Sequence, residues 1–472
     1  MAPAPEHPLR WLWDHARRAP DTAAILGQPE TLSYGQLLEN LGCWSRLMQA
    51  AGLDRERPVA IVTQHRSRLA RALWLALHDG VPLLTIDPSQ TQLGRLMRQC
   101  GVEQAIADAD LALPDGVCRL PARALDRPAG GSRNDPATME VDRPQLLVAT
   151  SGTEGTPRAV MLTCRNIASA AFATNRMLGL QRDDCWLCCL PLTHVAGIMI
   201  LMRCAAAGAG VCLQEGFDPR QVADAMVGQS VSHISLVPAM LHRLIQADVD
   251  PSGLKVAVVG GSGMSDRLAK DALASRWPVK IAYGLTETCA HVAVGDLLRS
   301  DRSLILQPGS RVEIVDRQDQ PAREVGFIQI TGPTVMAGYA NPDLAAGDGL
   351  AGPQTFRTQD LGRIDSDGRL RVIGRGDDML ISGGLNIHPA QVEDLMAACP
   401  GISEVAVVGI PDPVWGARLV ALYCGDVDEA DVGTWAAENI ASALRPRDFR
   451  RVPSLPRTSL GKLRRRELGR LV

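Results

Sequence analysis

The sequence of 472 residues contains very little lysine. Lysine and arginine together number 49, and only four of these are lysines: Lys255, Lys270, Lys280 and Lys462. The 52 acidic residues bring the formal net charge to -3, so no large basic surface for nucleic acid or an anionic membrane is expected. A lysine that persists in such a composition is a candidate for a role that arginine does not fill.

Aromatic residues are scarce as well. They make up 4% of the chain, so the core is expected to consist mainly of Ala, Leu, Val and Ile. The most apolar run, residues 196–202, is much shorter than the roughly 18 residues that a membrane span requires. Residues 1–18 contain no basic segment followed by an apolar stretch, so no secretory signal is recognised and a cytoplasmic location is expected.

The chain also lacks two common site motifs. Cys185, Cys188 and Cys189 have no second cysteine pair or nearby histidine at zinc spacing, so a zinc site is not expected. The cysteines, twelve in all, are expected to be mostly reduced core thiols. No Gly-Lys-Ser or Gly-Lys-Thr follows the glycine-rich stretch at residues 150–158, which excludes a Walker loop.

Short apolar segments alternate with helical segments along most of the chain, which predicts parallel βαβ units in an α/β fold. Strands are expected at residues 59–63, 81–86, 146–150, 185–190, 210–214, 233–237 and 256–260. From 310 to 375 short strands are separated by Gly and Asp turns, as in an antiparallel sheet or barrel. A smaller α+β unit follows, so we expect a large N-terminal domain at residues 1–376 and a small C-terminal domain at residues 377–472.

Two motifs suit the binding of phosphate groups. Residues 149–158 read Ala-Thr-Ser-Gly-Thr-Glu-Gly-Thr-Pro-Arg after an expected strand, and such a loop offers hydroxyls and backbone N–H groups to phosphate oxygens. Residues 283–287 read Tyr-Gly-Leu-Thr-Glu, and a hydroxyl beside a carboxylate suits Mg²⁺ that carries phosphates. The alternatives are a flexible turn for the first motif and a helix N-cap at Thr286 for the second.

Two further motifs lie near the C-terminus. Residues 358–360 read Thr-Gln-Asp, and an Asp at a strand end, with Arg375 nearby, can bind ribose hydroxyls. Residues 456–464 read Pro-Arg-Thr-Ser-Leu-Gly-Lys-Leu-Arg. The alternatives are a surface turn with a salt bridge for the first and a solvated basic tail for the second.

In this order the motifs resemble the adenylate-forming superfamily, which includes acyl- and aryl-CoA ligases, and the resemblance extends from about residue 9 to Leu468. Residues 190–203, 235–241 and 260–261 look like the o-succinylbenzoate–CoA ligases of menaquinone synthesis. Residues 377–389 are also similar to benzoate and 4-chlorobenzoate CoA ligases. The resemblance implies an ATP- and Mg²⁺-dependent ligase that converts an aryl acid to an acyl-AMP and then to a CoA thioester, with a mobile C-terminal domain. A homodimer is left open.

The resemblance also implies roles for individual residues. The phosphate loop would use Thr150, Ser151, Gly152, Thr153, Gly155 and Arg158. The residues that contact adenine, ribose and Mg²⁺ would be Gly261, Tyr283, Gly284, Thr286, Glu287, Asp360 and Arg375, with Glu287 as the metal ligand. The residues of the second step would be His194, which shields the adenylate, the hinge Asp377, and Gly384 beside the pantetheine. Lys462 would be the catalytic lysine of adenylation.

For some of these residues a structural role explains the sequence as well as a binding role does, or better. Trp415, Arg445 and Arg447 align with contacts to the CoA nucleotide, but the two arginines also suit a solvated helix end. Arg203 is a candidate for the distal carboxylate of succinylbenzoate, although an ion pair on a helix surface explains it more simply. The acid pocket itself is expected to draw on residues 193–203, 234–241, 260–264 and 282–291.

The chain departs from the family pattern at Glu154, where Thr is usual, and at Gln359, where Gly is usual. A carboxylate near a triphosphate repels it unless it points away or binds metal. Three functions therefore remain: an aryl-CoA ligase, an adenylating enzyme that loads a carrier protein, and a homologue that binds nucleotide or acyl groups without catalysis.

Overall fold

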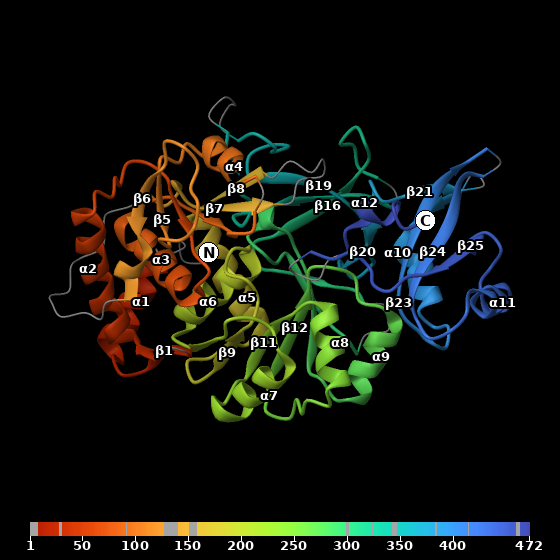
Figure 1. Cartoon of the computed structure of the whole chain (residues 1–472), viewed down its shortest axis with the longest axis horizontal. Helices are drawn as coiled ribbons and strands as arrows, with labels where there is room; N and C mark the ends of the chain where they lie inside the picture. Colours follow the sequence, from red (N-terminus) through yellow and green to blue (C-terminus); the bar gives the residue numbers. More distant parts are fainter. Residues whose placement is uncertain are drawn as a thin grey trace.

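The computed structural model describes residues 8–27, 31–90, 92–126, 140–150, 158–298, 302–322, 324–341, 347–382, 385–413, 415–458 and 463–472. Three sheets build the larger part of the molecule, and a fourth sheet with its own helices forms the C-terminal part at one end of the longest axis (Figure 1). Within the described part of the chain, every helix is too short or too polar to span a bilayer.

The larger sheet has nine strands in the order β15-β14-β13-β12-β11-β9-β10-β1-β2. Its strands are β1 (Ala23–Gly27), β2 (Leu32–Ser33), β9 (Cys185–Cys188), β10 (Gly210–Leu213), β11 (His233–Leu236), β12 (Val256–Gly260), β13 (Val279–Tyr283), β14 (Ala293–Asp296) and β15 (Ile305–Leu306). The run from β1 to β13 is parallel. On β12, Val256 and Val258 pack into one buried cluster and Ala257 and Val259 into another, because side chains alternate between two covered faces.

The second sheet has seven strands in the order β18-β8-β7-β4-β3-β5-β6. Its strands are β3 (Val59–Val62), β4 (Leu83–Ile86), β5 (Gln104–Ala107), β6 (Cys118–Pro121), β7 (Pro144–Thr150), β8 (Arg158–Thr163) and β18 (Gly338–Tyr339). Strands β3 to β7 pair in parallel, and β8 returns antiparallel beside β7. The strands predicted at residues 59–63, 81–86 and 146–150 are therefore confirmed, with their ends moved by one or two residues.

Helices cover both sheets (Figure 1). The helices of the N-terminal part are α1 (Pro8–Arg18), α2 (Tyr34–Ala50), α3 (Arg66–Asp79), α4 (Leu93–Gln99), α5 (Cys164–Leu178), α6 (Val195–Ala207), α7 (Pro219–Gly228), α8 (Pro238–Gln246), α9 (Asp266–Ala274) and the 3₁₀ turns η1 (Ala122–Asp126) and η2 (Thr286–Thr288). Capping residues set several of their ends. The Ser33 and Gln36 side chains form a capping box that starts α2, and Gly208, with a φ of 75°, ends α6.

The third sheet is antiparallel and has the order β16-β17-β19-β20, as expected for residues 310–375. Its strands are β16 (Arg311–Val315), β17 (Gly326–Thr331), β19 (Thr355–Ile364) and β20 (Leu370–Arg375). The long strand β19 changes one expectation: Asp360 lies inside a strand and not at its end. A register irregularity between Leu361 and Gly362 follows directly, so the pairing of β19 with β20 is interrupted beside Asp360.

The C-terminal part has a separate core. Its elements are β21 (Leu380–Ser382), β22 (Leu385–Ile387), α10 (Pro389–Met396), β23 (Ile402–Asp412), β24 (Gly416–Gly425), α11 (Glu429–Asn439), β25 (Asp448–Arg451) and α12 (Arg465–Leu468). The buried residues of the N-terminal clusters end at Leu370, and those of the two C-terminal clusters begin at Ile387.

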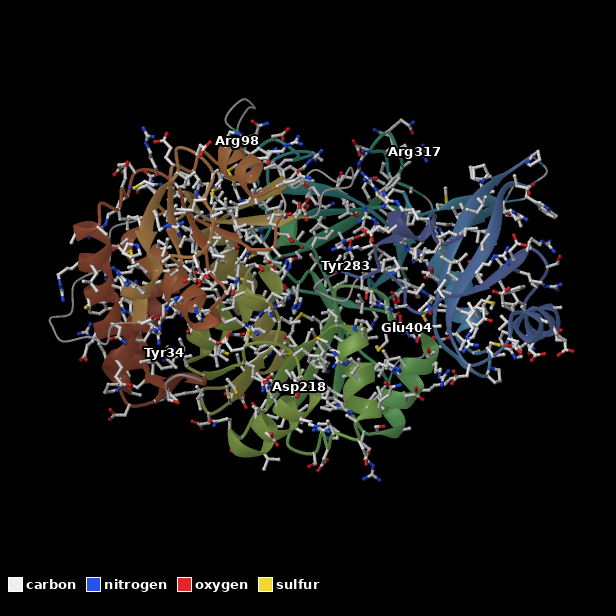
Figure 2. All side chains as sticks on the ribbon, viewed as in Figure 1. Tyr34, Arg98, Asp218, Tyr283, Arg317 and Glu404 are labelled. Carbon is white, nitrogen blue, oxygen red and sulfur yellow. The ribbon has the colours of Figure 1, made fainter. Side chains whose placement is uncertain are left out.

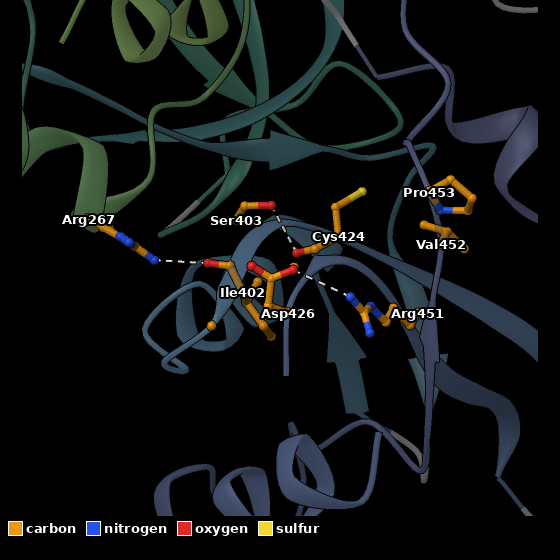
Figure 3. A pocket seen from close by; sticks show the side chains of 10 residues that line it. Arg267, Ile402, Ser403, Cys424, Asp426, Arg451, Val452 and Pro453 are labelled. Atoms are coloured by element: carbon orange, nitrogen blue, oxygen red, sulfur yellow. Dashed lines mark hydrogen bonds and ion pairs between the residues drawn. The ribbon is translucent and has the colours of Figure 1, made fainter. Parts of the chain in front are cut away.

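The two parts touch beside α9. The Arg267 guanidinium donates to the Ile402 carbonyl at 2.9 Å. A cleft of about 710 Å³ lies next to this contact, between α9 and the C-terminal sheet, and Ser403, Asp426 and Arg451 are among its lining residues (Figure 3).

Candidate functional site

Four neighbouring parallel strands of the larger sheet, β9, β11, β12 and β13, end at the same edge. The chain leaves these ends through the predicted pocket segments at residues 193–203, 234–241, 260–264 and 282–291. In open α/β sheets the carboxyl ends of the strands form the ligand-binding edge. Tyr283, the last residue of β13, marks this place near the middle of the molecule (Figure 2).

A tight turn follows β13 and requires Gly284. A Cβ at this residue would lie 1.7 Å from the carbonyl oxygen of Ala290. Cys289 and Ala290 hold the returning chain in the left-handed region, with φ values of 54° and 88°. Thr286 and Glu287 lie in a single 3₁₀ turn, with Leu285 as its preceding residue, so the alternative of a helix capped by Thr286 is wrong.

Glu287 lies close to the end of the predicted phosphate loop. Its Oε1 accepts a hydrogen bond of 2.8 Å from the Tyr339 hydroxyl. The Arg158 guanidinium lies over the Tyr339 ring, 5.2 Å from its centroid. Burial, together with the charge of Glu287, raises the pKa of Tyr339, so the hydroxyl remains a proton donor at neutral pH.

The two ends of the phosphate loop are held together. Thr150 ends β7, Arg158 begins β8, and the two residues are partners in the antiparallel ladder. The Thr150 hydroxyl also donates to the Arg158 carbonyl at 3.3 Å. The remaining predicted loop residues, and the unusual Glu154, lie outside the described residues: Ser151, Gly152, Thr153 and Gly155.

Tyr283 connects the larger sheet to the third sheet. Its hydroxyl donates to Oδ2 of Asp360 at 2.8 Å. Asp360 is only 9% exposed, and Arg375 is its partner in the pairing of β19 with β20. Burial and the charge of Asp360 raise the pKa of Tyr283 well above its usual value. The expected pair of Asp360 and Arg375 therefore lies beside the segment at residues 283–287. Gly261, whose φ is 84°, directly follows β12, the strand next to β13.

Arg375 also binds the predicted hinge. Its Nε and Nη2 donate to the two carboxylate oxygens of Asp377 at 2.8 and 2.7 Å. These hydrogen bonds hold the pKa of Asp377 below its usual range. Arg375 is the last residue of β20, so this bidentate pair closes the turn that leads into the C-terminal part.

His194 directly precedes α6 and is half-buried. Its backbone N–H donates to the Pro191 carbonyl at 3.2 Å. Gly197 packs against the same carbonyl, where a Cβ would approach the oxygen to 2.3 Å. The buried Arg66 side chain donates to the Leu190 carbonyl. The segment that carries His194 is therefore held by its own turn and by Arg66 at the start of α3.

Arg203 is buried, so the expectation of an ion pair on a helix surface is wrong. It is 1% exposed, and its Nη2 lies 3.2 Å from Nδ1 of His291. Among the described residues no carboxylate lies within ion-pair distance of this guanidinium. Burial lowers the pKa of Arg203 to about 10 and the pKa of His291 well below its usual value.

The candidate CoA contacts lie together on the C-terminal part. The Arg447 guanidinium lies 4.7 Å from the ring centroid of Trp415, which is 40% exposed. Arg445 donates to the carbonyls of Ala437 and Ile440 at the end of α11, which favours the helix-end alternative for this residue. Gly384 lies outside the described residues.

Lys462 lies outside the described residues, but both sides of its loop are anchored. Arg457 and Leu463 form an isolated antiparallel bridge. Arg465 donates to both carboxylate oxygens of Glu393 at 2.7 Å. Arg465, just after the motif, is therefore packed against the C-terminal part, whereas Arg457 and Arg464 are exposed, so the alternative of a solvated basic segment stays open for residues 456–464.

Tyr339 belongs to none of the sequence motifs, although it contacts Glu287 and Arg158. The available signal was its rarity, because the chain has only four tyrosines. Rarity alone does not identify its partner, since Glu287 and Tyr339 are brought together by tertiary contacts: the pairing of β18 with β8 and the hydrogen bond of 2.9 Å from the Met336 N–H to the Glu287 carbonyl.

Three sheets meet around residues 283–287, through the hydrogen bonds of Tyr283 with Asp360 and of Tyr339 with Glu287, and a small α+β part lies beside them; this is the architecture of an adenylate-forming enzyme. The family comparison agrees. The chain belongs to the AMP-binding enzyme family: the family model matches residues 12–340, and the model of the AMP-binding enzyme C-terminal domain matches residues 391–462.

Relatives match this chain over nearly its whole length. The 2-succinylbenzoate–CoA ligase of Bacillus licheniformis is 31% identical over 98% of this chain and 99% of that protein. The 2-succinylbenzoate–CoA ligase of Geobacillus kaustophilus is 30% identical over 98% of this chain and 97% of that protein.

Solved structures of the o-succinylbenzoate CoA synthetase of Bacillus subtilis have the same fold. The complex with the acyl-adenylate intermediate is 26% identical, with a TM-score of 0.87 and 97% of both chains covered. The complex with ATP and magnesium has a TM-score of 0.88 and also 26% identity, and covers 97% of this chain and 99% of that one. A double mutant of the same enzyme with a product analogue scores 0.73 over 97% of each chain. The arrangement described here is therefore closer to the ATP and adenylate complexes.

Proposed function

We propose that this chain is an ATP-dependent carboxylate–CoA ligase that forms an acyl-AMP and then an acyl-CoA thioester, with o-succinylbenzoate as its acid. The observation that carries the proposal is the segment at residues 283–287. At one end Tyr283 bonds Asp360, and at the other Glu287 meets Tyr339 beside Arg158. One ATP molecule would fit this arrangement, with its nucleoside at the first end and its phosphates at the second.

The two-step chemistry explains why such a site is needed. A carboxylate reacts poorly with a thiol because oxide would have to leave, whereas the mixed anhydride with AMP has a good leaving group. In the first step the carboxylate oxygen attacks the α-phosphorus of ATP, and pyrophosphate leaves. Two anions must meet, so the protein contributes mainly positioning and neutralisation of charge.

The residues proposed for the first step surround the phosphates. The phosphate loop from Thr150 to Arg158 binds phosphate oxygens. Glu287, assisted by Thr286, holds Mg²⁺, which prefers hard oxygen ligands and takes few from protein. Lys462 places its ammonium between the substrate carboxylate and the α-phosphate, where a compact charge fits better than a planar guanidinium.

The nucleoside is held on the other side. Asp360 and Arg375 bind the ribose hydroxyls, and Tyr283, Gly284 and Gly261 line the adenine. The left-handed Gly261 and the tight turn at Gly284 support this assignment, because both let backbone approach a flat ligand closely.

The second step requires the CoA thiol to reach the acyl-AMP. We place the domain boundary between residues 376 and 377, with Asp377 as the hinge, which the separate cores on either side support. The C-terminal part turns, Lys462 leaves, and the thiol enters past His194 and Gly384. The nucleotide of CoA stacks near Trp415 and Arg447; Arg445 acts at the end of α11 and contributes less.

Arg203 supports the choice of a dicarboxylic aryl acid. The buried charge of Arg203 has no carboxylate partner among the described residues. Its guanidinium lies next to His291, and both residues belong to predicted pocket segments. An unpaired buried cation favours an anionic ligand. The distal carboxylate of o-succinylbenzoate would supply that charge, and benzoate would not.

The test is pyrophosphate exchange and thioester formation with a panel of acids. We expect exchange with o-succinylbenzoate, little with benzoate, and a CoA thioester as the product. Arg203→Met should raise the KM for o-succinylbenzoate at least about tenfold and leave the KM for ATP unchanged. Equal use of both acids by the unaltered protein would contradict the choice of substrate.

The same experiment separates the alternative functions. Exchange without a thioester would favour transfer to a carrier protein, and no exchange with any acid would favour a non-catalytic binding protein.

We place the reaction in the cytoplasm, where ATP and CoA are available, and the free thiols of all twelve cysteines support a reducing compartment.

A further inference from the structure

Tyr339 is the residue through which Glu287 and Arg158 are connected. We propose that Tyr339 is a positioning residue: its hydroxyl orients the Glu287 carboxylate toward magnesium-bound triphosphate, and its ring keeps Arg158 from pairing with that carboxylate. The inference rests on the proposed function, since it assigns Glu287 to the metal and Arg158 to phosphate.

The first contact restricts the carboxylate. The Tyr339 hydroxyl donates to Oε1 of Glu287 at 2.8 Å. The last torsion of a glutamate side chain is soft, so without such a bond its two oxygens sample many orientations. With Oε1 held, Oε2 takes a defined position. Partners that orient a metal ligand in this way typically change metal affinity by about 10- to 100-fold when they are removed.

The second contact separates two opposite charges. The Arg158 guanidinium lies 5.2 Å from the ring centroid, over the face of Tyr339, while Glu287 is at its hydroxyl edge. These two described side chains form no direct ion pair in the structure; each contacts Tyr339 instead, and Arg158 also opposes the rise in the pKa of its hydroxyl. A direct pair would neutralise the cation meant for phosphate and the anion meant for the metal at the same time.

The ring itself is held firmly. Tyr339 pairs with Val160 in the ladder between β18 and β8, and its backbone N–H donates to the Asp348 carbonyl at 3.0 Å. A Cβ on Gly349, whose φ is 86°, would lie 2.4 Å from ring atoms of Tyr339. The ring thus packs against the backbone of Gly349, and the backbone of Tyr339 is fixed by the strand pairing, as a positioning residue requires.

The experiment measures ATP binding to the full chain by calorimetry, without acid or CoA, as free Mg²⁺ is varied. Tyr339→Phe keeps the ring and removes the hydroxyl, so we expect the Mg²⁺ concentration for half-maximal enhancement of ATP binding to rise about tenfold, with metal-free ATP binding unchanged. Tyr339→Leu removes the ring as well, and we expect it to weaken metal-free ATP binding too, because Arg158 then pairs with Glu287.

Tyr423→Phe is the matched control. It removes one hydrogen bond of 2.9 Å, to the Val427 carbonyl in the C-terminal part, and should leave the Mg²⁺ dependence unchanged. In a Glu287→Gln background, Tyr339→Phe should have no further effect on the Mg²⁺ dependence, since the carboxylate that it orients is gone.

A Tyr339→Phe variant that binds ATP with the Mg²⁺ dependence of the unaltered protein would overturn the positioning role and leave the proposed function intact. An equal weakening in the Glu287→Gln background would also overturn it. Absence of ATP binding by the unaltered protein at any Mg²⁺ concentration would instead overturn the proposed function, so the two failures are distinguishable.

Discussion

Gly284→Ala adds a single methyl group at the most crowded glycine of the site. The new Cβ would lie 1.7 Å from the Ala290 carbonyl oxygen, 2.6 Å from its carbonyl carbon and 2.7 Å from Cα of His291. Ordinary contact begins at 3.4 Å, so the deficit against the oxygen is 3.4 − 1.7 = 1.7 Å. All three neighbours are backbone atoms, which cannot rotate away, so the turn after β13 has to move.

That movement acts on both ends of the site. Tyr283 precedes the turn and Glu287 lies in it, and each is held by a hydrogen bond of 2.8 Å, to Asp360 and from Tyr339. A shift of half the deficit lengthens either bond beyond hydrogen-bonding range. A misplacement of about 1 Å costs about 100-fold in rate, which corresponds to about 2.7 kcal/mol. We also expect a loss of about 1–3 kcal/mol in the free energy of unfolding.

The assay is kcat/KM for ATP in pyrophosphate exchange, measured beside thermal unfolding. Gly216→Ala is the control, because a Cβ at that glycine meets no atom within 4 Å and the residue lies outside the predicted pocket segments, and it should change neither quantity. A Gly284→Ala variant with kcat/KM within twofold of the unaltered protein and an unchanged melting temperature would refute the reasoning.

Two further predictions concern the C-terminal part. Burial, with Asp266 and Glu393 nearby, raises the pKa of Asp394 to about 6, although Arg302 opposes the shift. Below the pKa of the unfolded chain Asp394 is protonated in both states and costs no stability; as the pH rises through about 6 the buried carboxylate ionises and destabilises the fold. Asp394→Asn removes this charge, so it should raise the free energy of unfolding by about 1 kcal/mol at pH 8, after allowance for solvent screening, and leave it unchanged at pH 4. An equal gain at both pH values in thermal unfolding would contradict this account. Lys462→Ala should abolish acyl-AMP formation and spare thioester formation from supplied acyl-AMP; parallel loss of both activities would speak against rotation of the C-terminal part.

The sequence predicted the elements whose formation depends on local pattern. Four strands of the larger sheet, β9, β10, β11 and β12, were recognisable because each is a short, buried apolar run followed by a helix or a glycine turn. The motifs at residues 283–287 and 149–158 were recognisable because their chemistry is contained in a few adjacent residues.

By itself, therefore, the sequence determined the α/β class, the antiparallel region after residue 310, the smaller C-terminal unit and the family. Only the tertiary structure decided that Asp360 lies inside β19 under the Tyr283 hydroxyl, that Arg203 is buried beside His291, and that Tyr339 reaches Glu287. These contacts join residues 52 to 88 positions apart. Their geometry follows from how three sheets meet at one edge, and no local periodicity or composition encodes that meeting.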